Sequence, residues 1–406
     1  MEDETPNSTL KRWYDCAGFA YFIAVSLLTT FWTSFGSSRI HYPIFEQATR
    51  NIFQSKMAYG FPYEAGTGYA TLWLYSPSCA LFFFSLFAFL PTILGKIFYL
   101  LLSTGVFISG VLAAARAVGF ENTLRRSHFF WILVSFEMVG ALSAYKIEVI
   151  TTGILLWAFW ALQTQRAVLG CLLLAIVTNW KFQGLPVAGL LLLTDARLNR
   201  SWRNIILFVV ALSLYSAAPF LFLSQQYLLE SQRVWIASLT ESLQVTWSTY
   251  QHIYAVALNI WPQSFSLKWA QAISALAGLG FALDLFIRSG APKTSRINLR
   301  LLAVGLGSAW IILFSPMSQS LAYILWTPLV LCAWILFKTY RQDQRLWIPV
   351  LWISAFLASM SYSDLTPQPI RGWFRQFGFK PVGILLLVVV LLWQTRRKKE
   401  AWSEAR

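Results

Sequence analysis

The stretch SRIHYPIFEQATRNIFQSKMAYGFPYEAGTGYATLWLYSPSCALFFFSLFAFLP, residues 38–91, places a polar, aromatic loop before a strongly apolar run. The loop carries the ionisable side chains His41, Glu46, Arg50, Lys56 and Glu64. The apolar run after it opens with Tyr75-Ser76-Pro77. Downstream, apolar runs alternate with short connectors, except for a second large polar segment at 222–268. The two polar segments therefore need a common structural explanation.

The composition predicts an all-α polytopic membrane protein. The chain is 57% hydrophobic and 17% aromatic but only 12% charged, whereas soluble domains are roughly 25% charged. Apolar runs long enough to cross ~30 Å of hydrocarbon as a helix recur along the whole length. We expect a single integral membrane domain over residues 1–406. It should contain about 12–13 transmembrane helices, each long enough to span the hydrocarbon core, and outward loops that form a cap.

The distribution of positive charge predicts topology. The chain has 32 basic and 17 acidic residues, a net charge of +15. The basic residues gather in connectors, at Lys11–Arg12, Arg116–Arg126, Arg197–Arg203, Arg288–Arg300, Lys338–Arg345 and Arg396–Lys399. Cytoplasmic loops of membrane proteins carry this excess, whereas nucleic-acid binding requires charge along a groove. We therefore expect no nucleic-acid partner.

The order of the runs then suggests which loops face outward. Residues 16–35 follow an acidic leader and lack a small-residue cleavage site, so we expect a retained first span with a cytoplasmic N-terminus. Residues 36–75 and 222–268 face outward and meet over the membrane surface. If 76–94 enters and leaves on one side, or is a short tilted helix, the basic connectors fall inside. We favour this solution over a full crossing, with both termini cytoplasmic in a multi-pass protein of the cell inner (plasma) membrane.

Charged residues in the outward turns have competing interpretations. Lys181 interrupts two short apolar runs, and Lys146 and Glu148 interrupt two others. Lys181 either extends to the headgroup level or pairs with Glu148, or it holds an anionic lipid headgroup at the mouth of the bundle. Lys146 presents the same alternatives. Glu137, inside an apolar run, is expected to form a buried, hydrogen-bonded helix contact.

Motifs for metal or nucleotide chemistry are missing from the sequence. The histidines are His41, His128 and His252, and we expect the second to be a residue of the cytoplasmic interface. There is no HExxH, CxxC, P-loop or GxSxG pattern, so we expect neither a metal site nor a cofactor. The cysteines lie in or beside apolar runs and are interpreted as packing residues: Cys16, Cys79, Cys171 and Cys332.

A series of short motifs points to a known family. They are His41 to Ala48 followed by Tyr59, then Tyr75-Ser76-Pro77, Lys181 with Pro186, and Ser315-Pro316. In this order they resemble the C-type glycosyltransferases, and specifically the mannosyltransferase-like glycosyltransferase family 87, over most of the chain. The chain departs from the family pattern in three places. His41 stands where an aspartate base is usual, Tyr145–Glu148 replaces Gly-Gln-x-Asn, and no histidine follows Ser315-Pro316.

The resemblance implies a hexosyltransferase. The donor would be a sugar on a polyprenyl phosphate in the membrane, and the acceptor an extracytoplasmic lipid or glycan. The base would be His41 or Glu46, with Glu64 as a further candidate. The expected substrate-binding residues are Arg50, Glu64, Tyr75, Lys146, Glu148, Lys181 and His252. Glu46 and Arg50 are also spaced for a purely structural ion pair on one helix face.

Two other functions fit the same sequence. A transporter or flippase of lipid-linked precursors would bind the same ligands without bond chemistry, but it should show symmetric halves. The chain instead has one asymmetric polar cap and no repeat. An inactive scaffold of the same fold is the second alternative, and the missing aspartate is the observation in its favour.

Overall fold

The computed structural model describes residues 6–36, 41–60, 63–65, 69–71, 73–242, 252–260, 267–289, 293–315, 320–339, 344–360, 369 and 379–404. The N-terminal half contains α1 (Pro6–Phe35), α2 (Tyr42–Phe53), α3 (Pro77–Cys79), η1 (Ala80–Phe84), α4 (Ser85–Ala88), α5 (Thr92–Ala117), α6 (Glu121–Arg125), α7 (His128–Ser143), α8 (Glu148–Gln163), α9 (Ala167–Trp180), η2 (Phe182–Gly184) and α10 (Leu185–Asn199). The C-terminal half contains α11 (Arg203–Ala217), η3 (Ala218–Leu221), α12 (Gln225–Ser242), α13 (Ile253–Ile260), α14 (Leu267–Arg288), α15 (Lys293–Phe314), η4 (Ser320–Trp326), α16 (Thr327–Thr339), α17 (Gln344–Met360) and α19 (Phe379–Glu404). A hairpin of β1 (Tyr63–Ala65) and β2 (Tyr69–Thr71) lies in the first polar segment.

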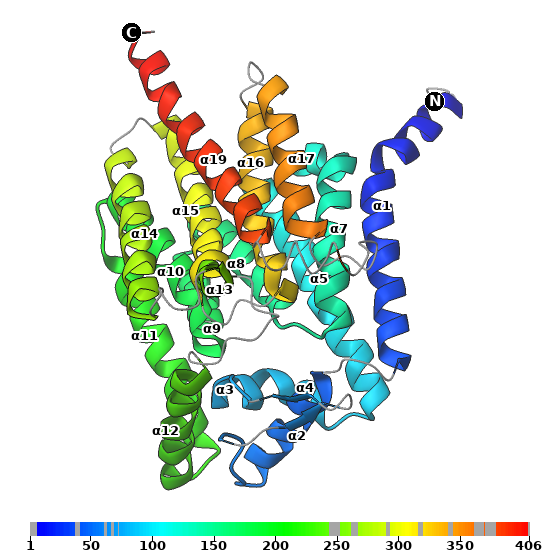
Figure 1. Ribbon diagram of the computed structural model, residues 1–406, viewed down its shortest axis with the longest axis vertical. Coiled ribbons are helices and arrows are strands. Elements are labelled where there is room, and N and C mark those ends of the chain that lie inside the picture. Colours follow the sequence, from blue (N-terminus) through cyan, green and yellow to red (C-terminus); the bar gives the residue numbers. More distant parts are fainter. Residues whose placement is uncertain are drawn as a thin grey trace.

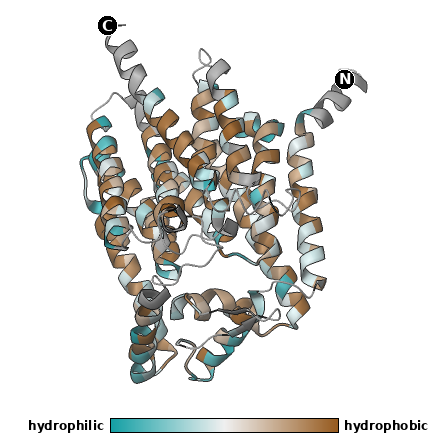
Figure 2. Cartoon of the chain, in the orientation of Figure 1, coloured by the Kyte–Doolittle hydropathy of each residue, from teal (hydrophilic) through white to brown (hydrophobic). Residues whose placement is uncertain are grey.

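The helices form an elongated bundle, with both chain ends at one end of it (Figure 1). Hydrophobic residues cover the middle of the bundle, and hydrophilic ones gather at its two ends (Figure 2). Among the described residues, four helices are long and apolar enough to cross a membrane: Asp15–Phe35, Thr92–Ala117, Arg203–Leu221 and Lys268–Arg288. Shorter apolar helices pack among them, which confirms the predicted all-α membrane fold.

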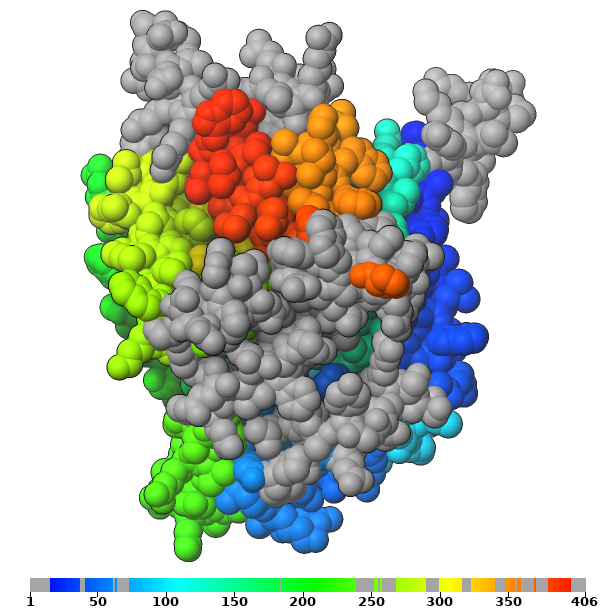
Figure 3. All heavy atoms as spheres, in the orientation of Figure 1, coloured from blue at the N-terminus to red at the C-terminus, as the bar shows by residue number. Residues whose placement is uncertain are grey.

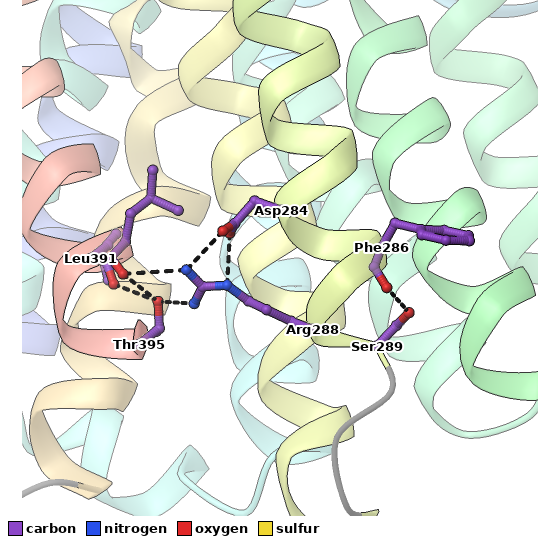
Figure 4. A network of polar contacts seen from close by, with 7 residues as sticks. Asp284, Phe286, Arg288, Ser289, Leu391 and Thr395 are labelled. Carbon is purple, nitrogen blue, oxygen red and sulfur yellow. Dashed lines mark hydrogen bonds and ion pairs between the residues drawn. The ribbon is translucent and has the colours of Figure 1, made fainter. Parts of the chain in front are cut away.

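Contacts between distant segments place the basic connectors at the end that carries both termini. Arg126 lies 4.0 Å from Asp15 near the start of α1. Phe120 packs edge-on against Trp334 near the end of α16. Arg288, at the end of α14, pairs with Asp284 and donates to Thr395 of α19 (Figure 4). This arrangement agrees with the topology that the charge distribution predicts.

The conformation of residues 77–88 bears on whether this segment counts as a membrane crossing. The side chain of Ser76 accepts a hydrogen bond from the Cys79 amide and begins α3. A π-helical turn, η1, then interrupts the helix before α4 ends at Ala88. The three short pieces pack with α2 beyond the lower end of the bundle, where α5 starts (Figure 1). The segment therefore lies beside α2 at the end of the bundle, an arrangement that agrees with the favoured solution.

The two polar segments meet at the end of the bundle opposite the termini. The Tyr227 hydroxyl in α12 donates to the Lys56 carbonyl at 2.7 Å. The Trp235 indole, about two turns further along α12, donates to the Leu74 carbonyl at 3.0 Å. Figure 3 shows both segments on the lower surface, α12 in green and residues 41–89 in blue. The predicted contact between the segments is confirmed, and we refer to α2, the hairpin, α3, η1, α4 and α12 as the cap.

A close backbone contact joins α5 and α8. A Cβ atom on Gly153 would lie 2.5 Å from the Val106 carbonyl oxygen, and one on Gly110 would lie 2.3 Å from the Gly153 oxygen. A side chain at either glycine would therefore push the two helices apart. Because α8 begins at Glu148, this contact also fixes the position of the Glu148 backbone.

Gly153→Ala is accordingly expected to destabilise the protein by about 1–3 kcal/mol, the usual cost of overpacking. Gly105→Ala, also on α5, is the matched control, because a Cβ there meets nothing within 4 Å. Thermal unfolding of both variants in detergent measures the difference. Equal melting temperatures for the two variants would contradict the close contact.

Candidate functional site

His41 and Lys146 lie together beneath the cap. His41 directly precedes α2, and Lys146 lies in the turn between α7 and α8. That turn is tight, because Tyr145 adopts a left-handed conformation with φ of 52°. Its hydroxyl donates to the Thr33 carbonyl near the end of α1. The Lys146 Nζ consequently points to His41 Nε2 at 3.3 Å, although 105 residues separate them.

Glu148 and Lys181 form an ion pair next to these residues. Glu148 is the first residue of α8, and Lys181 follows the last residue of α9 in an extended conformation. Lys181 Nζ lies 2.5 Å from Glu148 Oε1 and 5.8 Å from the centre of the Tyr75 ring. Glu148 Oε2 is buried and has no hydrogen-bond partner among the described residues. Of the alternatives for Lys181, the pairing with Glu148 is thus shown.

The electrostatics of the four residues favour a bound anion. The positive charge of Lys146, together with burial, lowers the pKa of His41 to about 3, so the imidazole is neutral at physiological pH. Burial lowers the pKa of Lys146 to about 8, which still leaves it mostly charged at pH 7. Two lysines, one carboxylate and a neutral imidazole carry a formal charge of +1. A single anionic group would neutralise it.

Asn179 connects the site to the cap and to α11. Its side-chain oxygen accepts from Ser76 Oγ at 2.7 Å, and its nitrogen donates to Ser216 Oγ at 2.8 Å. The neighbouring Trp180 donates to the Tyr215 hydroxyl. The sequence analysis did not select Asn179, although it lies in the same polar interruption as Lys181. Its position two residues before Lys181, within that interruption, was the available signal in the sequence.

A small cavity of about 10 Å³ opens beside Lys181, lined by Thr151, Leu155, Val177, Lys181, Gly184, Ile311 and Leu325. This volume accommodates about one water molecule. A phosphate group is larger, so its binding requires the surrounding side chains or the cap to shift. The lining also shows that α15 and η4, from the C-terminal half, border the site.

The other predicted residues lie elsewhere or have different partners. Glu46 pairs with Arg50 at 2.9 Å on the exposed side of α2 and accepts from Thr92 at 3.3 Å. The predicted alternative of a structural pair is thus shown. Glu64 has backbone pairing with Ala70 in the hairpin. His252 is buried, and its ring stacks on Tyr254. The structure therefore brings together five predicted residues: His41, Tyr75, Lys146, Glu148 and Lys181.

Further sequence-based predictions have structural outcomes. Glu137 forms a buried pair with Lys380, 3.0 Å apart, which confirms the expected helix contact. His128 accepts a hydrogen bond from the Gly18 amide, joining α7 to α1. Cys16 is exposed, so the interpretation that it packs inside was wrong. The order of the apolar runs also predicts that Ser315–Leu321 and Asp364–Pro381 face outward, and both segments lie largely outside the described residues.

The altered pKa values predict how the site responds to pH. Because His41 stays neutral down to about pH 3, binding of an anionic ligand should show no step near pH 6.5. It should weaken above about pH 8, where Lys146 loses its proton and one of two cations disappears. Lys146→Arg, which stays charged, should move this loss to higher pH. The affinity for an anionic ligand measured from pH 5 to 10 for both proteins tests this, and an unchanged alkaline limb in the variant would contradict it.

A known protein family matches the sequence of this chain. In the parts of the chain that the structure describes, no group of three or more His, Cys, Asp or Glu residues is arranged to hold a metal ion. No curated protein matches the sequence. The profile of glycosyltransferase family 87 matches residues 73–316, more than half of the chain, including Lys146, Glu148 and Lys181. This membrane protein belongs to glycosyltransferase family 87.

Proposed function

We propose that the protein transfers a hexose, such as mannose, from a polyprenyl-phosphate donor to an extracytoplasmic lipid or glycan acceptor. The observation that supports this most directly is the buried cluster of His41, Lys146, Glu148 and Lys181, with its net positive charge. It lies at the end of the bundle opposite the termini, which the positive-inside rule assigns to the outer face of the inner (plasma) membrane.

The chemistry of such a donor fits the cluster. Its isoprenoid tail stays in the bilayer, so its phosphate is held at the depth of the membrane surface. When the sugar is transferred, the bond from the anomeric carbon to the phosphate oxygen breaks and negative charge grows on that oxygen. Lys146 and Lys181 are placed to stabilise this charge, and fixed cations in a dry site do so without the reorganisation that water requires.

The surrounding residues have supporting roles in the proposal. His41 is held neutral by Lys146, whose ammonium donates to Nε2, so the ring proton lies on Nδ1 and can be donated to a sugar or acceptor oxygen. The Tyr75 ring lies beside Lys181 and offers a face for a sugar to pack against. Phosphate is a good leaving group at the anomeric carbon, so the departing oxygen needs little acid catalysis, and we expect no soluble cofactor.

The test uses the full-length protein in vesicles that contain a radiolabelled polyprenyl-phosphate mannose and a crude lipid acceptor fraction. We expect a labelled product from this donor and none from a nucleotide-linked mannose. Absence of product from polyprenyl-phosphate mannose, glucose and other hexoses would overturn the proposal. If the intact donor crossed the membrane without product, the protein would instead be a flippase.

A further inference from the structure

We infer that Glu148, at the start of α8, is the catalytic base of this enzyme and accepts the proton of the attacking hydroxyl. The inference rests on the proposed function. It differs from what the resemblance implies, because that places the base in the first outward loop. It follows from three features of the structure: a carboxylate oxygen without a partner, a rigid mount for the carboxylate, and the state of the alternative groups.

The first feature is the unused oxygen of Glu148. Oε1 is bound to Lys181, whereas Oε2 is buried and has no hydrogen-bond partner in the parts of the chain that the structure describes. A buried acceptor without a hydrogen bond usually costs about 1–3 kcal/mol, more when it is charged. Such an atom is explained when a substrate supplies the missing donor. A hydroxyl group of the acceptor is a donor of the right kind, and its proton would then point at a carboxylate.

The second feature is how firmly this carboxylate is mounted. The Thr152 hydroxyl donates to the Glu148 carbonyl at 2.6 Å, within the first turn of α8. The Gly110 contact with Gly153 holds the same turn against α5. The Lys181 pair fixes the side chain itself. A base that is pre-positioned in this way needs no reorganisation at the moment of proton transfer.

The third feature is the state of the other candidate bases. His41 Nε2 accepts from the Lys146 ammonium at 3.3 Å, so the neutral ring has no acceptor nitrogen left for the proton of a hydroxyl. Glu46 is engaged by Arg50 and Thr92. Among the side chains that the structure describes in the cluster, Glu148 supplies the carboxylate, and it lies beside both lysines.

The proposed step balances without a further reactant. The acceptor oxygen forms a bond to the anomeric carbon as the bond from that carbon to the phosphate oxygen breaks. The leaving group takes the bonding electron pair as polyprenyl phosphate, next to Lys146 and Lys181. The acceptor proton passes to Glu148 Oε2 and is later lost to water. One base thus takes up the proton, and two neighbouring cations stabilise the leaving group.

The experiment compares wild type, Glu148→Gln and Glu148→Asp in the vesicle assay. Glu148→Gln keeps the shape and can still accept a hydrogen bond from Lys181, but it cannot take up a proton. We expect it to lower kcat at least ~100-fold, as loss of a general base typically does, with KM and donor affinity changed only a few-fold. Glu148→Asp should retain partial turnover, with a changed pH profile at constant melting temperature.

Each outcome decides between specific alternatives. If the role of Glu148 is purely structural, its substitution should lower the melting temperature and the amount of folded protein, without lowering kcat of the folded fraction. Turnover of folded Glu148→Gln within tenfold of wild type would overturn the assignment while the proposed function stands. If Glu148→Gln does not fold, full wild-type kcat and pH profile in Glu148→Asp would overturn it instead. Lack of transfer by the wild type would refute the proposed function itself.

Discussion

Lys181→Met is expected to lower the rate of sugar transfer about 100- to 1,000-fold, the usual effect of removing one stabilising group from a preorganised anion site. The variant removes the cation beside the leaving phosphate and also leaves Glu148 buried without its ion-pair partner. Breaking one side of a buried pair costs about 3–5 kcal/mol. Both transfer and stability should therefore fall. Initial rates in vesicles and thermal unfolding in detergent measure the two effects.

Two further variants separate these effects. Lys338→Met removes an exposed lysine near the opposite end of the bundle and should leave both quantities unchanged. The double variant Lys181→Met/Glu148→Gln removes both charges of the pair, so it should regain stability but not activity. Recovery of transfer in the double variant would show that Lys181 acts only by neutralising Glu148 and that Glu148 is not the base. Normal transfer in Lys181→Met would remove Lys181 from the site.

Lys380→Met is expected to have the largest effect on stability outside the site, a loss of about 3–5 kcal/mol. Lys380 lies in the first turn of α19 and contacts both carboxylate oxygens of Glu137 in α7, at 3.0 and 3.2 Å. Its ammonium also lies 4.6 Å from the centre of the Tyr323 ring in η4. All three side chains are buried, so the variant leaves a carboxylate in an apolar environment where it cannot be hydrated. Thermal unfolding in detergent measures the loss.

Two controls for Lys380→Met test whether the loss comes from a buried, unpaired charge. Glu137→Gln/Lys380→Met removes both charges and should be more stable than Lys380→Met alone. Arg50→Gln breaks the exposed Glu46–Arg50 pair on α2 and should change stability by less than about 1 kcal/mol. If Lys380→Met and Arg50→Gln unfolded at the same temperature, the buried pair would not hold α19 to α7.

The sequence was sufficient to predict the class of protein and much of its topology. Hydrophobic runs and basic connectors report directly on membrane insertion, because each depends on local composition alone. The same holds for the Glu46–Arg50 pair, whose spacing of four residues is a property of a single helix. The behaviour of residues 76–94 was left between two solutions by charge counting. The π-helical interruption and the packing of η1 and α4 on α2 agree with the solution in which this segment does not cross.

Which charged residues meet could be decided only by the tertiary structure. Lys146 reaches His41 across 105 residues, and Lys380 reaches Glu137 across 243. Apolar runs are similar to one another, so the sequence of a span does not specify its neighbour. The two short turns that hold Lys146 and Lys181 were visible as polar interruptions, but their shared site was not. Composition thus determined where charge could be placed along the chain, and helix packing determined that four such residues form one buried cluster.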